Sequence, residues 1–301
     1  MLAWFQLLRI ALAPSILWDC VAGALLAATA FEASTGQAAD IDASVLIATA
    51  GILLSVFHAG MAWNDWTDRA IDRAAGRGRP LADGRLPASA GLGAGFVLFG
   101  LALGLAAWML PSRLQEVAIL CGLVAVYDLG GKSLRAVAGP VLLALCRILS
   151  LYLGMLVVLA PADVIGHSGT WPLLCYGLYV MFLSRLAARE EEGLPGSRAV
   201  VPVAACAFAP VVLVSNQSDH LAFVLPVWFL FAAWLLRPAL ADRHLAWSPQ
   251  RTQAAVRRCL IGMPMIPALA LLASPAPFYW AGGGLIAVAA SRLLVRRFPP
   301  E

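Results

Sequence analysis

Acidic side chains recur at helical spacing in the segment NDWTDRAID, residues 64–72. If this segment is a helix, Asp65, Asp68 and Asp72 lie at i, i+3 and i+7 on one face, with Asn64 at its edge. Carboxylates held this close repel one another unless a cation lies among them. Because the set offers hard oxygen ligands and neither histidine nor cysteine, it favours Mg²⁺, which binds a few carboxylates together with waters and substrate phosphates.

A glycine- and arginine-rich segment, RGRPLADGR, follows at residues 77–85. Guanidinium groups such as those of Arg77 and Arg79 match phosphate oxygens in bidentate geometry. The two segments together therefore favour a cation beside a phosphate ligand. The alternative interpretation is a solvated turn, in which the acids pair with Arg69 and Arg73.

The composition determines which elements must position these residues. Apolar residues make up 61% of the 301 residues and charged residues 13%, and the mean hydropathy is +0.82. Soluble domains carry about 45–50% apolar and about 25% charged residues. The chain has too little charge to cover a water-facing surface, and its hydropathy excludes a nucleic-acid binder despite the net charge of +4. It is predicted to lie in a lipid bilayer.

The apolar residues gather in segments that approach or exceed the length of about 20 residues needed to cross a bilayer. Lipid cannot satisfy backbone polar groups, and β-barrel strands would alternate in polarity, so these segments are predicted to be helices. The fourth is short, and the last two could form one span plus a re-entrant segment. We therefore expect an all-α bundle of nine or ten transmembrane helices. The segments are 10–31, 43–63, 89–110, 115–127, 138–160, 171–187, 199–215, 221–236, 259–273 and 278–295.

The basic residues predict how the helices cross the membrane. With the amino terminus and every second loop in the cytoplasm, nineteen of the twenty-one lysines and arginines face that side, as the positive-inside rule requires. Polar loops starting near residues 64 and 185 divide a single domain, 1–301, into two four-helix repeats plus carboxy-terminal helices. We expect a multi-pass protein of the bacterial plasma membrane with a cytoplasmic active site.

One predicted span contains an arginine near its middle, Arg147. An arginine at mid-span costs about 2.5–3.5 kcal/mol on insertion scales, so it should face the bundle interior and have a partner. Asp19, on the first span, is the expected counter-ion. The pair is either structural, or Arg147 points into a cavity and helps to bind a diphosphate or an acceptor.

The motif NDxxDxxxD at the end of the second span, followed by RPLxxGxL, resembles the UbiA superfamily of intramembrane prenyltransferases, and the resemblance covers most of the chain. It implies that Mg²⁺ is held against the diphosphate of an isoprenyl donor, with Asn64, Asp68 and Asp72 as ligands and Asp65 as a direct or indirect partner. The family also places a tyrosine and a lysine after the fourth helix, where this chain has Tyr127 and its sole lysine, Lys132. The resemblance implies that Lys132 neutralises diphosphate, although ordinary positive-inside topology would also place a lysine there.

The second aspartate motif of the family is altered in this chain. In SRLAAREEEG, residues 184–193, Glu192 takes the place of the second aspartate and Ala188 that of the first. Three outcomes are open: Glu190 to Glu192 rebuild the site, the site binds one ion less, or activity is lost. A solvated charged turn is the structural alternative. The REEEG loop and the sequence CRxL around Arg147 resemble the EboC-like branch of the superfamily.

The function implied is Mg²⁺-dependent transfer of a prenyl group from a prenyl diphosphate to a lipophilic or aromatic acceptor within the bilayer. The alternative is a non-catalytic UbiA-like membrane protein that binds or helps to move an isoprenoid or lipophilic metabolite. Catalysis is assigned to Asp68, Asp72 and Lys132. The predicted substrate-binding residues are Arg77, Arg79, Tyr127, Lys132 and Arg147. The predicted metal ligands are Asn64, Asp65, Asp68, Asp72 and Glu192.

Overall fold

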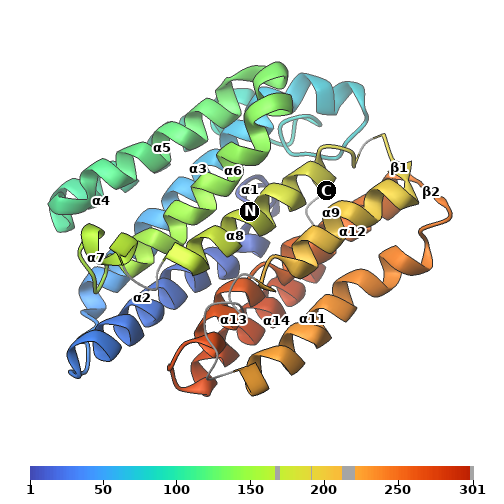
Figure 1. Cartoon of the computed structure of the whole chain (residues 1–301). Coiled ribbons are helices and arrows are strands. Elements are labelled where there is room, and N and C mark those ends of the chain that lie inside the picture. The colour runs from blue at the N-terminus through green and yellow to red at the C-terminus, as the bar shows by residue number, and fades with distance from the viewer. Residues whose placement is uncertain (167–169, 191, 212–220, 299–301) are drawn as a thin grey trace.

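The segments predicted to cross the membrane are helical over most of their described residues in the computed structural model, which describes the chain except residues 167–169, 191, 212–220 and 299–301. Figure 1 shows the helices packed side by side as a bundle. Those of the first half are α1 (Leu2–Leu7), η1 (Ile10–Leu12), α2 (Ala13–Thr35), α3 (Ala43–Ala74), α4 (Ala88–Met109), η2 (Pro111–Arg113), α5 (Leu114–Leu129) and α6 (Gly131–Met155). Those of the second half are α7 (Pro161–Gly166), α8 (Thr170–Ala187), α9 (Gly196–Phe208), α11 (Leu221–Ala241), α12 (Pro249–Gly262), α13 (Met265–Ala273), η3 (Phe278–Ala281) and α14 (Gly282–Arg297).

Seven helical segments among the described residues are long and apolar enough to cross a membrane. The chain is therefore a multi-pass integral membrane protein of the all-α class, as predicted. The predicted spans 115–127, 171–187 and 199–215 correspond to the helices α5, α8 and α9, outside those seven. Residues 212–215 lie beyond the described part of the chain. The number of nine or ten crossings stays a prediction.

Two glycines bring α2 and α6 together in the middle of the bundle. A Cβ atom on Gly23 would lie 2.3 Å from the carbonyl oxygen of Leu151, and one on Gly154 would lie 2.5 Å from that of Cys20. Membrane helices associate through such close contacts between small residues, because lipid provides no hydrophobic force between them. The crossing also fixes the turns that carry Asp19 and Arg147, each near one of these glycines in sequence.

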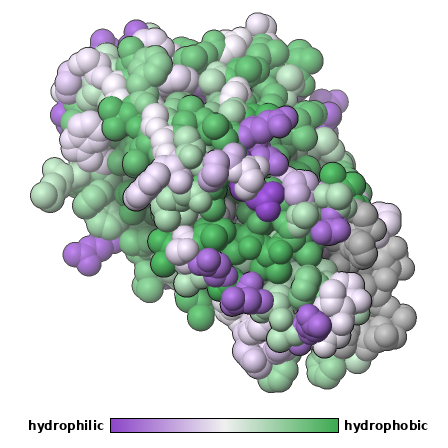
Figure 2. Space-filling view, turned by 90° about the vertical axis from the view of Figure 1, so that its left-hand side faces the viewer, coloured by the Kyte–Doolittle hydropathy of each residue, from purple (hydrophilic) through white to green (hydrophobic). Residues whose placement is uncertain are grey.

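Hydrophobic residues occupy much of the face of the molecule that Figure 2 shows. Val137, Trp108 and Leu230 expose 85%, 81% and 73% of their surface. Large apolar side chains this exposed are compatible with a hydrocarbon surrounding. The exterior therefore fits a bilayer.

The polar loops meet at one end of the bundle. Figure 1 shows the loop between α3 and α4 at the same end as a short two-stranded sheet. Its strands β1 (Leu194–Pro195) and β2 (Ala246–Trp247) are antiparallel, with Leu194 opposite Trp247. This pairing joins the loop after α8 to the linker after α11. The two acidic segments identified in the sequence therefore lie at the same end of the molecule.

Candidate active site

The helix α3 carries the acidic motif beyond the predicted span 43–63. Its 32 residues exceed the about 20 needed to cross a bilayer, so its last turns hold residues 64–72 at the end of the bundle. Hydrogen bonds from the Ser44 hydroxyl and from the amides of Ser44 and Val45 cap its first turn and hold the pKa of Asp42 below its usual range. The predicted helical conformation of the motif is confirmed.

Asp65 and Asp72 form one half of the site. Both are buried, with 3% and 0% of their surface exposed. Nη1 of Arg79 lies between them, 3.3 Å from Oδ1 of Asp65 and 2.8 Å from Oδ2 of Asp72. Arg9 adds a contact of 3.1 Å to Asp65, and Arg77 adds one of 2.7 Å to Asp72. Three arginines, two from the loop directly after α3 and one from the amino-terminal segment, thus neutralise two buried carboxylates.

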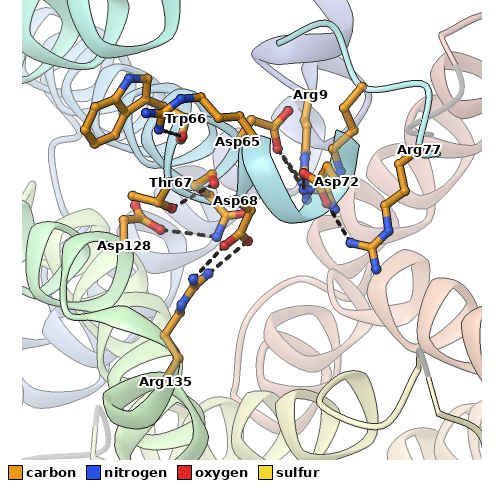
Figure 3. A network of polar contacts seen from close by, with 12 residues as sticks. Arg9, Asp65, Trp66, Thr67, Asp68, Asp72, Arg77, Asp128 and Arg135 are labelled. Carbon is orange, nitrogen blue, oxygen red and sulfur yellow. Dashed lines mark hydrogen bonds and ion pairs between the residues drawn. The ribbon is translucent and has the colours of Figure 1, made fainter. Parts of the chain in front are cut away.

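Asp68 forms the other half, turned towards α6 (Figure 3). The guanidinium of Arg135 binds it in bidentate fashion, with N–O distances of 2.9 Å and 2.6 Å. A step of three residues rotates a side chain by about 60° from perfect alignment in a helix of 3.6 residues per turn. The face predicted to be shared by three aspartates is therefore divided, with Asp65 and Asp72 on one side and Asp68 on the other.

The predicted partners Arg69 and Arg73 do not hold the aspartates. Nη1 of Arg69 donates to the carbonyl of Trp66 at 2.5 Å, and its guanidinium lies over the Trp66 ring. Nε of Arg73 donates to the carbonyl of Ala82 at 2.9 Å. Because Asp65 and Asp72 are buried, the interpretation as a solvated turn is wrong. The arginines on these carboxylates come from elsewhere in the chain.

Arg9 reaches the site from a strained backbone. It has φ of 48°, the one non-glycine residue with positive φ in the described part of the chain. Such conformations are costly and persist where surrounding contacts hold them. Here Nδ1 of His58 on α3 lies 2.6 Å from the carbonyl oxygen of the preceding residue, Leu8. This hydrogen bond ties the amino-terminal segment to α3, and the guanidinium of Arg9 contacts Asp65.

Asp128, at the end of α5, was missed by the sequence reasoning. It is 2% exposed, and its Oδ1 accepts a long hydrogen bond of 3.5 Å from Nδ2 of Asn64. The adjacent Tyr127 packs its ring towards Gly139 of α6. The only signal in the sequence was that Asp128 follows Tyr127, a residue already singled out. Lys132 lies in the first turn of α6, which begins at Gly131, but its side chain is not among the described parts of the chain.

Two other predicted site residues lie in different settings. Glu192 is 73% exposed at its side chain and pairs with Arg189 at 3.2 Å, while Glu191 is not among the described residues. Arg147 contacts Asp19 at 2.8 Å, as expected, and the Tyr176 hydroxyl donates to the other oxygen of Asp19 at 2.7 Å. The side chain of Arg147 is 12% exposed and that of Asp19 fully buried. The pairing is confirmed, and it connects α2, α6 and α8.

The donors at the end of α3 suit a magnesium ion in chemistry. They are carboxylates and an amide, the hard oxygen ligands that Mg²⁺ prefers. Two of the buried polar atoms that have no hydrogen-bond partner among the described residues lie at this end of the bundle: Oδ2 of Asp128 and Nε of Arg79. The oxygen of Asp128 could bind a cation, and the nitrogen of Arg79 could donate a hydrogen bond to an anion. Within the described residues, no group of three acidic, histidine or cysteine side chains is arranged to hold a metal. The aspartates at the end of α3 are paired with arginines instead.

Comparison with known proteins identifies the fold. No protein-family model and no curated protein matches the sequence. Solved structures do match. A UbiA homologue from Aeropyrum pernix K1 has a TM-score of 0.64 at 14% identity, over 91% of this chain and 96% of that one. A UbiA homologue from Archaeoglobus fulgidus bound to DMAPP and Mg²⁺ has a TM-score of 0.58 at 13% identity, over 95% and 99%. A digeranylgeranylglyceryl phosphate synthase has a TM-score of 0.57 at 14% identity, over 94% and 98%.

The fold and the site thus define a polytopic helical membrane protein with aspartates and arginines gathered at one end of the bundle. Its fold is that of the UbiA homologues of solved structure, which confirms the resemblance carried by residues 64–72 at the level of the fold. Membership of the EboC-like branch stays a prediction.

Proposed function

We propose that this chain is an intramembrane prenyltransferase, which uses Mg²⁺ and a prenyl diphosphate donor to alkylate a lipophilic or aromatic acceptor. The observation that carries the proposal is the cluster at the end of α3, where Asp65, Asp68 and Asp72 meet arginines from three other segments. The matching folds of homologues bound to DMAPP or GPP with Mg²⁺ support it.

Asn64, Asp65, Asp68 and Asp72 are the residues that would hold the ion. Bound there, Mg²⁺ would act as a Lewis acid on the departing diphosphate. Glu192 stays a predicted ligand from the second loop, and Lys132 a predicted partner of the diphosphate.

The arginines of the cluster bind the phosphate oxygens in this proposal. Arg77 and Arg79 approach Asp72 from the loop after α3, and Nε of Arg79 is a buried donor with no partner among the described residues. Guanidinium groups pair with phosphate in the geometry they use for carboxylate. The same guanidinium groups can therefore exchange a carboxylate for a phosphate group when the donor binds.

The bundle supplies a water-free surrounding for the reaction. The carbon–oxygen bond of the donor breaks with its electron pair leaving on the diphosphate, and the acceptor forms the new bond to the allylic carbon and loses a proton. Side chains from several helices exclude water, which would otherwise capture the allylic cation. We place the site at the cytoplasmic face of a bacterial plasma membrane, because the arginine distribution follows the positive-inside rule.

The competing function is binding without catalysis. It is favoured by Glu192, which is exposed and paired with Arg189. A protein of this kind would bind a prenyl diphosphate and Mg²⁺ without releasing diphosphate.

The test is release of diphosphate by the purified protein in lipid nanodiscs. Donors of increasing chain length, beginning with DMAPP and GPP, are incubated with and without Mg²⁺ and a mixture of lipophilic and aromatic acceptors. We expect Mg²⁺-dependent release that falls at least a hundredfold in Asp68→Asn and Asp72→Asn, by analogy with the loss of other transition-state charge contacts. Asp83→Asn is the matched control, because Asp83 pairs with Arg85 in the loop. Tight Mg²⁺-dependent binding of every donor with no release would favour the binding protein instead.

A further inference from the structure

Three helices of the second half carry arginines with no acidic residue to balance them. Each of α11, α12 and α14 belongs to a segment long and apolar enough to cross a membrane, and together they hold seven arginines and neither aspartate nor glutamate. Of the seven, only Arg251 forms a salt bridge with a described residue, Asp242 in the linker after α11. The six others are Arg237, Arg257, Arg258, Arg292, Arg296 and Arg297. This surplus contrasts with the end of α3, where arginines and aspartates pair.

Two of these arginines converge on one tryptophan. The guanidinium carbon of Arg258 on α12 lies 5.9 Å from the ring centroid of Trp234 on α11, and that of Arg292 on α14 lies 5.3 Å from it. The helix α12 packs against both α11 and α14 (Figure 1). A Cβ atom on Gly262, one turn after Arg258, would lie 3.0 Å from the Trp234 ring, so this ring lies against α12. A tryptophan face attracts a guanidinium but carries no net charge. Two cations are thus held at one neutral ring, where an anion would relieve their repulsion.

The positive-inside rule accounts for arginines in the loops but not for this convergence. Arg258 follows the first residue of α12 by nine residues, and Arg292 precedes the last residue of α14 by five. A helix rises 1.5 Å per residue, so the two lie about 14 Å and about 8 Å from those helix ends. An arginine within a span is costly without a partner. Because no carboxylate among the described residues pairs with either one, the partner we infer comes from outside the chain.

The surface beside this pair suits acyl chains. Leu230 lies one turn before Trp234 on α11, and Leu285 lies two turns before Arg292 on α14, so each shares a face with the residue it precedes. Both leucines lie nearer the middle of their candidate spans, and they expose 73% and 60% of their surface. The two guanidinium groups therefore lie at one end of an exposed apolar surface. This arrangement fits an amphiphile with an anionic headgroup better than a free inorganic anion.

We propose that Trp234, Arg258 and Arg292 bind the headgroup of an anionic phospholipid, from the leaflet around the end of the bundle that carries the polar loops. The phosphodiester oxygens accept hydrogen bonds from the two guanidinium groups, and the tryptophan lies at the headgroup level, which its amphipathic ring favours. The acyl chains follow the exposed faces of α11 and α14. Basic sites between membrane helices bind such headgroups. The inference goes beyond the proposed function and does not depend on it, because none of these residues belongs to the cluster at the end of α3.

The experiment measures lipid binding to the full chain in detergent by native mass spectrometry. Phosphatidylglycerol and phosphatidylcholine with the same acyl chains are titrated separately, and glycerol phosphate, which has no acyl chain, is tested as a competitor. The wild type should bind phosphatidylglycerol more tightly than phosphatidylcholine, and glycerol phosphate should not displace it. One arginine near an anionic lipid surface contributes about fivefold in affinity, so Arg258→Gln/Arg292→Gln should weaken phosphatidylglycerol binding about tenfold or more. Its binding of phosphatidylcholine should be unchanged.

Arg257→Gln/Arg296→Gln is the matched control. It removes the same charge from the same two helices, both side chains are exposed, and neither guanidinium lies over a ring of the described residues. This variant should keep most of the preference for phosphatidylglycerol. Arg258→Lys/Arg292→Lys should recover part of the affinity, because the charges remain. Arg292→Gln alone changes an exposed residue and keeps the fold; it should weaken binding about fivefold, and an unchanged affinity in it overturns the site.

Thermal unfolding in the same detergent shows whether folded proteins are being compared. Phosphatidylglycerol should raise the melting temperature of the wild type and of Arg257→Gln/Arg296→Gln, because a ligand that binds only the folded state stabilises it. It should raise that of Arg258→Gln/Arg292→Gln less. Equal losses of affinity in the two glutamine double variants indicate diffuse attraction to surface charge and overturn the site. Equal affinity of the wild type for both lipids, or displacement of phosphatidylglycerol by glycerol phosphate, overturns its assignment to an anionic lipid.

Discussion

The buried contact between Asp19 and Arg147 allows a sharp test of how this bundle is held together. Asp19 is fully buried and accepts from Arg147 at 2.8 Å and from the Tyr176 hydroxyl at 2.7 Å. Removing one partner of a buried ion pair leaves an uncompensated charge and costs about 3–5 kcal/mol, whereas replacing both partners by apolar residues of similar volume is often neutral. Arg147→Met and Asp19→Leu should each be strongly destabilising, and the double variant should be more stable than either.

Tyr176→Phe provides an intermediate perturbation. It removes one hydrogen bond to a carboxylate and leaves Arg147 in place, so it should cost about 1.5–3 kcal/mol. The assay is equilibrium unfolding in mild detergent, followed by tryptophan fluorescence. If the destabilisation of the double variant equals the sum of the two single values, the two residues are not coupled and the reasoning is refuted.

The same double variant separates the two roles predicted for Arg147. If the pair of Asp19 and Arg147 is structural, the folded double variant should release diphosphate at a rate close to that of the wild type. A role in binding the donor or acceptor predicts a raised KM or a lost rate in every variant that lacks the guanidinium, irrespective of Asp19. The side chain of Arg147 is 12% exposed, so its contact with Asp19 leaves little of it for a substrate.

Three further predictions follow from the packing and the charges. Gly154→Leu should destabilise the protein by about 1–3 kcal/mol or more, because a Cβ atom there would lie 2.5 Å from a carbonyl oxygen. Gly100→Ala is the control and should not destabilise the protein, since no atom lies within 4 Å of a Cβ at that position. The unfolding midpoints of the two variants are compared, and equal midpoints would contradict the packing of Gly154. Arg135→Gln should strengthen Mn²⁺ binding, because it frees Asp68, and should weaken binding of a diphosphate analogue. Calorimetry with each ligand measures both affinities. Weaker Mn²⁺ binding would argue against the exchange of Arg135 for a cation at Asp68. Ser34→Cys should react with an impermeant maleimide only from outside the cell, and Ala75→Cys only from the cytoplasm. Labelling of sealed vesicles of known orientation measures both reactions. The reverse pattern would invert the predicted topology.

The fold could be predicted from the sequence because its causes are local. Hydropathy located the apolar helices, since an apolar run of sufficient length has no alternative to helix in lipid. The helical spacing of Asp65 and Asp72 placed them together, and the single charged residue within each of two spans predicted the pair of Asp19 with Arg147. Each inference depended on one segment or on the rarity of charge within the membrane.

Two partners of the aspartates, Arg9 and Arg135, could not be predicted, because they depend on how distant segments pack. Arg9 precedes Asp65 by 56 residues and Arg135 follows Asp68 by 67. Positive-inside topology places arginines at this face whatever their role, so sequence gives no means of choosing among them. The nearest arginines, Arg69 and Arg73, were the reasonable expectation, but they bind backbone carbonyls instead. Asp128 was missed for the same reason, since only the packing of α5 on α3 reveals its buried oxygen.

The charge balance of the cluster suggests why arginines and a cation can share the same carboxylates. Four aspartates lie near four arginines, so the group is close to neutral without a ligand. A cation entering alone would have to displace guanidinium groups with no new partner for them, and a diphosphate alone would meet carboxylates that repel it. Entering together, the cation binds carboxylates while the released guanidinium groups bind the phosphate oxygens, so each group that loses a partner gains another of opposite charge. Cation and diphosphate should therefore bind cooperatively in the proposed enzyme, and the arginine pairs of the ligand-free protein keep its carboxylates from repelling one another until both arrive. The residues of this exchange are Asp65, Asp68, Asp72 and Asp128 with Arg9, Arg77, Arg79 and Arg135.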